Sequence, residues 1–109
     1  MLDIIIPCHN TAQTLPRAVQ SCLNQPEAER IWLIDDASTD NTWQTILQLQ
    51  QQFPNKIQAF RLPENGGAAM ARNWGALQSS APLIAFLDAD DEYQQGALAL
   101  SLIHISEPT

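Results

Sequence analysis

Short apolar runs alternate with segments of helical periodicity along this chain. Runs rich in Ile, Leu and aromatic residues at 3–6, 30–34 and 83–87 predict buried strands, because stretches of this length and composition are typical of a sheet interior. Pro7 is expected to end the first of them. Residues 57–62 alternate between apolar and polar, which predicts a further strand nearer an edge of the sheet.

Three helices are predicted between these strands, from apolar residues that recur every three or four positions. The first spans about 11–24, the second begins after the capping residues Ser38-Thr39-Asp40, and the third spans about 68–79, after a turn at Asn65-Gly66-Gly67. The residues expected to face inward are Leu15, Val19, Cys22 and Leu23 in the first helix, Trp43, Ile46 and Leu47 in the second, and Met70, Trp74 and Leu77 in the third.

Repeated strand–helix alternation predicts an α/β fold with βαβ crossovers and a mainly parallel sheet. A chain of 109 residues is expected to form one domain. Residues 101–109 continue neither pattern and resemble the peptide encoded when an open reading frame runs into sequencing-adapter DNA. We therefore expect the domain to occupy 1–100, followed by a non-native or disordered tail, and the natural protein to be longer.

The net charge is −7, and the five basic residues are scattered along the chain. A nucleic-acid-binding protein usually carries a basic patch or stripe, so this composition argues against that class. Cys8 and Cys22 are expected to be free and reduced, with Cys8 buried. The sequence shows no signal peptide and no apolar stretch near the roughly 20 residues of a membrane span, which predicts a soluble chain.

The acidic residues are concentrated in two segments that follow predicted strands. Seven of the twelve carboxylates lie in 35–40 and 88–92. Ligands of open α/β sheets bind beyond the carboxyl ends of the strands, and clustered like charges need a cation or donors to neutralise them. The pattern Asp88-Ala89-Asp90-Asp91 therefore indicates a hard divalent cation bridging phosphate oxygens. Capping of a following helix is the alternative interpretation of these aspartates.

Three further motifs lie at the same predicted edge. Asp35-Asp36 could accept hydrogen bonds from a ligand, or could form a turn and cap. Asn65-Gly66-Gly67 lets a ligand approach the backbone, with Arg72 one turn into the next helix, although an ordinary turn and a surface arginine explain the pattern equally well. His9 could pack against a base or be a surface residue. No nucleophile–base arrangement is evident.

Together these motifs resemble the nucleotide-sugar-binding half of a family 2 glycosyltransferase with the GT-A fold, over about residues 2–100. The matching segments, in order, are Ile4-Ile5-Ile6-Pro7-Cys8-His9-Asn10, Leu23-Asn24-Gln25, Ile34-Asp35-Asp36-Ala37-Ser38-Thr39-Asp40-Asn41-Thr42, Asn65-Gly66-Gly67 with Ala71-Arg72-Asn73 and Gly75, and Phe86-Leu87-Asp88-Ala89-Asp90-Asp91. Such motifs in a fixed order are far more specific than any one of them.

The resemblance implies a role for each matching residue. Pro7 and His9 would flank the nucleobase, and Asp36 would hydrogen-bond it, uracil being the base most common in the family. Arg72 would lie near the nucleotide phosphates. Asp88 would lie toward the ribose and metal-bound water, and Asp90 would be the direct Mn²⁺ or Mg²⁺ ligand. His9 stands where the family usually has a tyrosine, which bears on donor preference.

The resemblance also implies what this chain lacks. The family's catalytic base and acceptor pocket lie in the second half of the domain, so no catalytic residue is assigned here. The complete enzyme would be a hexosyltransferase that inverts the anomeric centre with metal assistance, using a UDP-sugar donor and a saccharide or lipid-linked acceptor. It would work in the cytoplasm, at the inner face of a membrane, in the synthesis of envelope polysaccharide. The present chain is expected to bind the donor without turnover.

Three other classes remain as alternatives. A phosphoacceptor receiver domain has its acidic pair after the first strand, where this chain has Pro7-Cys8-His9, and needs a lysine near the last strand, whereas Lys56 is the only lysine. A nucleotidyltransferase usually has a Gly-rich basic loop after the first strand, and residues 8–15 contain neither Gly nor Lys. The third class is a non-catalytic module that binds sugar nucleotides.

Overall fold

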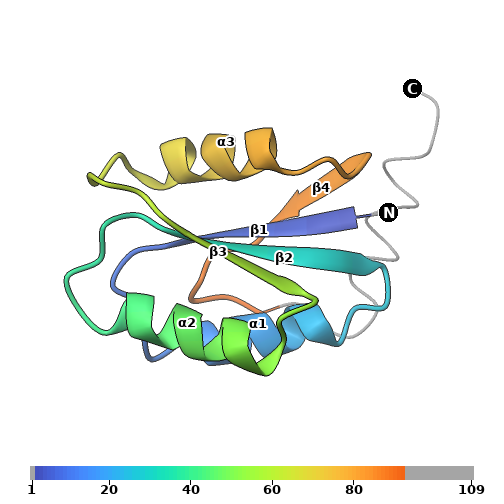
Figure 1. Ribbon diagram of the computed structural model, residues 1–109, viewed down its shortest axis with the longest axis horizontal. Helices are drawn as coiled ribbons and strands as arrows, with labels where there is room; N and C mark the ends of the chain where they lie inside the picture. The colour runs from blue at the N-terminus through green and yellow to red at the C-terminus, as the bar shows by residue number, and fades with distance from the viewer. Residues whose placement is uncertain (1, 93–109) are drawn as a thin grey trace.

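The computed structural model describes residues 2–92 (Figure 1). Its strands are β1 (Leu2–Cys8), β2 (Ala28–Asp35), β3 (Ile57–Arg61) and β4 (Leu83–Phe86), and its helices are α1 (Leu15–Leu23), α2 (Thr42–Gln52) and α3 (Ala68–Gln78). Every predicted strand and helix is present, in the predicted order. The tail expected at 101–109 lies outside the described residues and stays a prediction.

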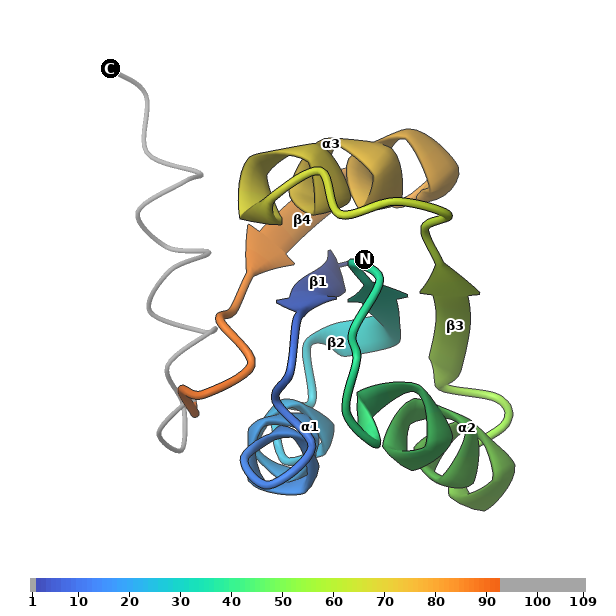
Figure 2. The same cartoon turned by 90° about the vertical axis from the view of Figure 1, so that its left-hand side faces the viewer.

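The four strands form one parallel sheet in the order β3-β2-β1-β4. Helices α1 and α2 cover one face, and α3 covers the other (Figures 1 and 2). This confirms the predicted α/β class with a mainly parallel sheet, and it confirms β3 as an edge strand. The chain leaves β1 on one side to reach β2 and returns on the other side to β4, so the topological switch point lies between β1 and β4.

The core is divided by the sheet into two apolar layers because successive strand residues face opposite sides. Ile4 and Ile6 of β1 are buried in the layer beneath α1 and α2, together with Leu15, Val19 and Ile46. The smaller layer beneath α3 contains Ile5, Trp32, Ile34, Leu62 and Ala71, with Phe60 and Trp74 packed against it. The central strands are therefore apolar on both faces, which explains their near-continuous runs of Ile and Leu.

Pro7 lies inside β1, so the prediction that it ends the strand is wrong. The Ile5 carbonyl, two residues earlier, accepts a hydrogen bond from the Leu87 N–H at 3.1 Å, on the β4 side. Pro7 faces the same side, because residues two apart in a strand point in the same direction, and pairing between β1 and β4 has already ended at Ile5. At this position β4 would not use a backbone N–H from β1, so the proline costs the sheet no hydrogen bond.

The predicted inward faces of α2 and α3 are correct only in part: Ile46 is buried and Trp43 and Trp74 pack against the core, but three other residues are exposed. Met70 and Leu77 of α3 are 57% and 81% exposed, and Leu47 of α2 is 41% exposed, so their predicted inward positions are wrong. The buried residues of α3 are Ala71 and Gly75. A Cβ built on Gly75 would lie 2.8 Å from Cγ2 of Ile5, which shows that the backbone of α3 approaches the sheet too closely for larger side chains.

Candidate functional site

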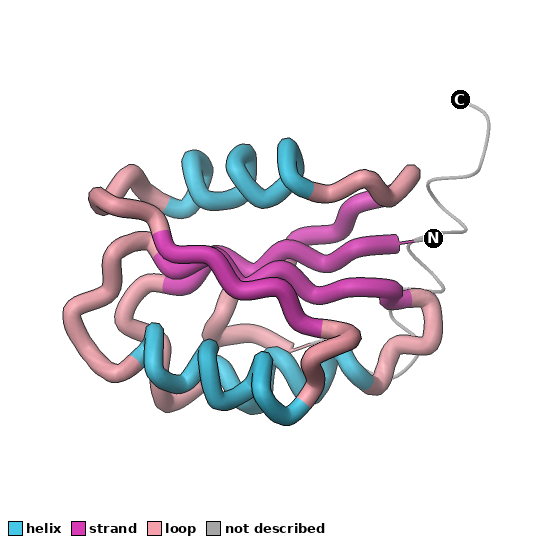
Figure 3. Tube along the Cα trace, viewed as in Figure 1, coloured by secondary structure: helices cyan, strands magenta, loops and turns pink. Residues whose placement is uncertain are grey.

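The loops that follow the strands gather at one end of the sheet (Figure 3). They comprise residues 9–14 after β1, 36–41 after β2, 62–67 after β3 and 87–92 after β4. This is the end where open α/β sheets bind ligands, since loops from both sides of the switch point meet there. All the sequence-predicted site residues except Pro7, which is buried in β1, and Arg72, which is half-buried on α3, belong to these loops.

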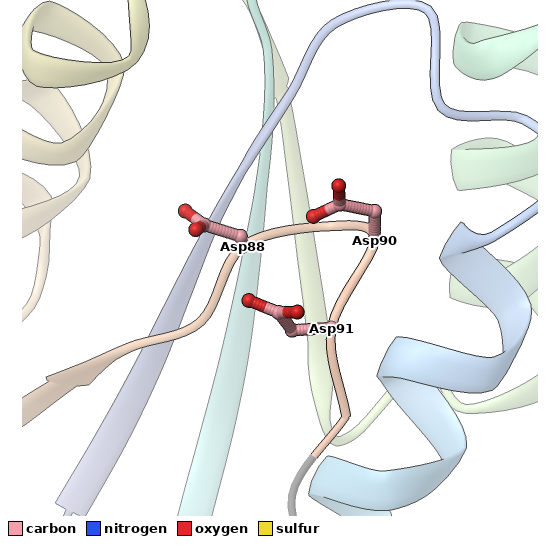
Figure 4. A group of neighbouring side chains, drawn as sticks. All are labelled: Asp88, Asp90 and Asp91. Carbon is pink, nitrogen blue, oxygen red and sulfur yellow. The ribbon is translucent and has the colours of Figure 1, made fainter.

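The turn after β4 carries a cluster of three carboxylates. Oxygens of Asp88, Asp90 and Asp91 lie within 4.8 Å of one another, and all three side chains are exposed (Figure 4). Leu87 and Ala89 are buried and anchor the turn, and the Asp91 N–H donates to the Asp88 carbonyl at 3.0 Å. The alternation of buried and exposed residues thus directs the carboxylates outward. Hard oxygen ligands in this arrangement suit Mg²⁺ or Mn²⁺.

Asp36 is 2% exposed, and its carboxylate holds the loop that precedes α3. Oδ1 accepts the Gly66 N–H at 2.8 Å, and Oδ2 accepts the Gly67 N–H at 2.9 Å. Gly67 has φ +90°, a left-handed conformation that strongly favours glycine. Each carboxylate oxygen of Asp36 has a lone pair left for a further hydrogen bond, but each already accepts a backbone N–H of its own chain.

Asp35 is fully buried beside Asp36. Its Oδ1 accepts hydrogen bonds from the N–H and hydroxyl of Ser38, and its Oδ2 lies 3.3 Å from Nε of Arg61. The Arg61 guanidinium lies 5.8 Å from the centroid of the Trp43 ring. Asp35 is thus a structural carboxylate that fixes the end of β2, because a buried charge needs paired donors.

His9 is exposed at the end of β1 and contacts two other loops. Its Nδ1 lies 2.9 Å from the Asp36 carbonyl oxygen. Nδ2 of Asn65 lies 3.2 Å from Nδ1 and 3.3 Å from Nε2 of His9, and 3.4 Å from the same carbonyl. The structure therefore brings His9, Asp36 and Asn65 together. The sequence analysis singled out Asn65 as a turn residue and gave its side chain no role.

Asn10 joins the loop after β1 to the loop after β2. Its backbone is left-handed, with φ 53°, and its Oδ1 accepts the N–H groups of Thr39 at 2.9 Å and Asp40 at 3.3 Å. Asp40 accepts hydrogen bonds from the hydroxyl and N–H of Thr42, and these lower the pKa of its carboxyl group. The N-cap of α2 is Asn41, without a side-chain capping hydrogen bond, so the prediction that Ser38, Thr39 or Asp40 caps the helix is wrong, and Asp40 instead bonds Thr42 from one position earlier.

An open pocket of about 490 Å³ lies between these two loops and the acidic turn. Asp90 is the predicted site residue that lines this pocket. The lining of the pocket is Asn10, Thr11, Ala12, Gln13, Thr14, Asp40, Asn41 and Asp90. The polar residues at 10–14 and 41 were not predicted as site residues. The sequence could have indicated them only by their position in the segments that follow predicted strands.

Cys8 and Cys22 are free and buried, as expected. Burial, together with the nearby charge of Asp35, raises the pKa of the Cys8 thiol, and burial raises the pKa of Cys22 to about 12. Both groups are therefore held as thiols, which are poor nucleophiles and poor metal ligands. Within residues 2–92, no helix combines the length and apolar character needed to cross a membrane.

Comparison with known proteins places this geometry in a family. The family model described as glycosyl transferase family 2 matches residues 3–108. The succinoglycan biosynthesis protein ExoU of Rhizobium meliloti is 41% identical over 95 residues, which cover 87% of this chain and 28% of that protein.

Two solved structures show the same fold. The mannosyltransferase PcManGT from Pyrobaculum calidifontis, in complex with GDP-Man and Mn²⁺, has a TM-score of 0.90 at 21% identity, covering 99% of this chain and 33% of that one. S. aureus TarS 1-349 in complex with UDP-GlcNAc has a TM-score of 0.79 at 24% identity, covering 95% of this chain and 30% of that one. The chain thus spans about a third or less of the length of each, and it belongs to glycosyl transferase family 2 and has the GT-A fold.

Proposed function

We propose that this chain is the donor-binding part of a glycosyltransferase that transfers a sugar from a nucleotide-diphospho-sugar. The observation that carries the proposal is the cluster of Asp88, Asp90 and Asp91 at the switch point of the sheet, facing outward on an anchored turn. A diphosphate and a carboxylate cluster repel each other unless a divalent cation lies between them. Such a cluster is therefore suited to a ligand that arrives with a metal.

The donor set fits a hard divalent cation. Asp90 is proposed as the direct ligand of Mn²⁺ or Mg²⁺, and Asp88 as the carboxylate directed toward the ribose and metal-bound water. A bound cation supplies Lewis-acid neutralisation of the diphosphate leaving group. The chain itself orients this site through the buried Leu87 and Ala89 on either side of Asp88. The complex of PcManGT with GDP-Man and Mn²⁺ supports the choice of cation.

The nucleotide is proposed to lie over the ends of β1 and β2. His9 and Pro7 would flank the base, Arg72 would approach the phosphates from α3, and Asp36 would lie beside the base. Asp36 already accepts the N–H groups of Gly66 and Gly67, so its contribution includes holding that loop in place. UDP is the proposed nucleotide, and the complex of TarS with UDP-GlcNAc supports this choice.

We infer that the catalytic base and the acceptor pocket belong to the part of the full-length protein beyond this chain. The cluster of outward-facing carboxylates in the described loops lies on the turn that would hold the cation, so those groups would be committed to the metal rather than to the proton of the acceptor hydroxyl. The full-length protein is proposed to be an inverting hexosyltransferase, whereas this chain binds the donor without turnover. We propose that the full-length protein acts on a saccharide or lipid-linked acceptor in cell-envelope polysaccharide synthesis at the cytoplasmic face of a membrane, and the part that ExoU has in succinoglycan biosynthesis supports the polysaccharide assignment.

Calorimetric titration of the purified chain with UDP, with and without Mn²⁺, tests the proposal. We expect metal-dependent binding that Asp90→Ala weakens at least about tenfold, or 1.4 kcal/mol. Glu64→Ala is the matched control, because Glu64 is an exposed carboxylate on a neighbouring loop outside the cluster. A chain that is folded by circular dichroism and binds no UDP in the presence of Mn²⁺ would refute the donor site.

A further inference from the structure

The imidazole of His9 is contacted at both ring nitrogens by groups from three loops. The Asp36 carbonyl lies 2.9 Å from Nδ1, and this oxygen can only accept a hydrogen bond. Nδ1 must therefore carry a proton and donate it. A neutral imidazole has one proton, so Nε2 is left as an acceptor.

Two amide groups lie beside the imidazole. Nδ2 of Asn10 lies 3.5 Å from Nε2, and Nδ2 of Asn65 lies 3.2 Å from Nδ1 and 3.3 Å from Nε2, so the Asn65 amide packs against the ring rather than on one of its nitrogens. The orientation of the Asn65 amide is itself fixed, because Nδ2 also lies 3.4 Å from the Asp36 carbonyl. Turning the amide over would place two oxygens against each other, so the nitrogen must face His9.

The same loop is attached to the end of β2 a second time. Gly66 and Gly67, which follow Asn65, donate their N–H groups to the buried Asp36 carboxylate. The position of Asn65 is therefore set by a buried residue, although its own side chain is exposed. Through Asn65, the end of β2 determines how the imidazole at the end of β1 is held.

We propose that Asn65 is a positioning residue that holds His9 in one orientation and in its Nδ1–H tautomer, as a fixed surface on which a nucleobase stacks. The stacking role rests on the proposed function. A ring that is already ordered loses little conformational entropy when a base packs on it, so the fixed imidazole strengthens binding. Asn65 acts through His9, because its side-chain amide packs against the ring and keeps Nδ1 directed at the Asp36 carbonyl.

Long-range ¹H–¹⁵N correlation of the imidazole nitrogens, recorded without ligand at a pH where histidine is neutral, reports the tautomer directly. His9→Gln assigns the signals, because the chain has two histidines. We expect the Nδ1–H tautomer in the wild type, although free histidine favours Nε2–H. Asn65→Ala and the isosteric Asn65→Asp should both weaken this preference, because neither places an amide N–H against the ring to keep Nδ1 directed at the Asp36 carbonyl. Asn55→Ala, an exposed asparagine before β3, should leave it unchanged.

Titration with UDP and Mn²⁺ measures the consequence for binding. We expect Asn65→Ala to weaken UDP binding about three- to tenfold, as for the loss of one hydrogen-bonded contact. A wild-type Nε2–H tautomer, or an Asn65→Ala variant that keeps both the tautomer and the affinity, would overturn the inference while leaving the donor site intact. A folded wild type that shows the tautomer but binds no UDP would refute the proposed function, and the stacking role with it.

Discussion

Replacing Asp36 by asparagine tests whether this carboxylate holds the β3–α3 loop. The side chain is 2% exposed and accepts the Gly66 and Gly67 N–H groups, one on each oxygen. Asparagine has almost the same shape but one oxygen, so an amide nitrogen would face one of the two N–H groups. One of these N–H groups then loses its partner, and the other loses a charged acceptor. We expect Asp36→Asn to lower the free energy of unfolding by about 2–4 kcal/mol.

Thermal unfolding of the ligand-free chain, followed by circular dichroism, measures this change. At about 4–8 °C per kcal/mol for a domain near this size, the melting temperature should fall by roughly 8–30 °C. Asp88→Asn is the matched control, since it makes the same chemical change at an exposed residue and relieves repulsion in the acidic cluster. Its stability should change by less than about 0.5 kcal/mol. Equal melting temperatures for the two variants would show that Asp36 does not hold the loop.

Two further predictions concern packing beneath the helices. Gly75→Ala should lower the urea midpoint, because the added Cβ would lie 2.8 Å from Ile5 Cγ2, and overpacking that costs about 1–3 kcal/mol exceeds the roughly 1 kcal/mol gained in helix propensity. An unchanged or higher midpoint would contradict this close approach. Cys8 and Cys22 should resist a thiol reagent at pH 8, because burial raises both pKa values, that of Cys22 to about 12, and so lowers the thiolate fraction. Both should react in denaturant, and rapid labelling of the native chain would show that they are accessible.

The order and type of the elements could be predicted from sequence because each depends on local periodicity. The inward face of α2 could be predicted at Trp43 and Ile46 but not at Leu47, and the inward face of α3 could not be predicted beyond Trp74. Met70 and Leu77 have the spacing of a buried stripe, yet α3 approaches the sheet through Ala71 and Gly75. Ala and Gly contribute little to a hydrophobic pattern. For a helix that packs closely through such small residues, the periodicity of the larger apolar residues therefore predicts the wrong buried face.

Pro7 illustrates a second limit. Whether a proline ends a strand depends on whether a neighbouring strand needs its N–H, and this is decided by where β4 stops. β4 pairs with β1 only as far as Ile5, and it lies nearly 80 residues later in the chain. No local pattern around Pro7 contains that information, so the sequence supports only the general expectation that proline disrupts pairing.

The two acidic segments show why the candidate site could be located from sequence but only partly assigned. Both follow a strand and have similar composition, yet Asp35 and Asp36 are buried and accept hydrogen bonds from their own chain, whereas Asp88 and Asp90 face solvent. The difference arises from which backbone N–H donors lie within reach of each carboxylate. Asp36 meets the N–H groups of a loop about 30 residues away, and the β4 turn meets no such loop within the described residues.

A carboxylate with internal donors stabilises the fold, whereas a cluster without them has unbalanced negative charge that a cation can neutralise. The donors that Asp36 uses also place Asn65 against His9, so the buried acidic segment shapes the surface beside which the exposed one would hold its ligand. The segment after β2 therefore affects the candidate site by holding its loops in place, and the segment after β4 affects it by its negative charge. A substitution in the first should alter stability and His9 together, while one in the second should alter metal-dependent binding alone.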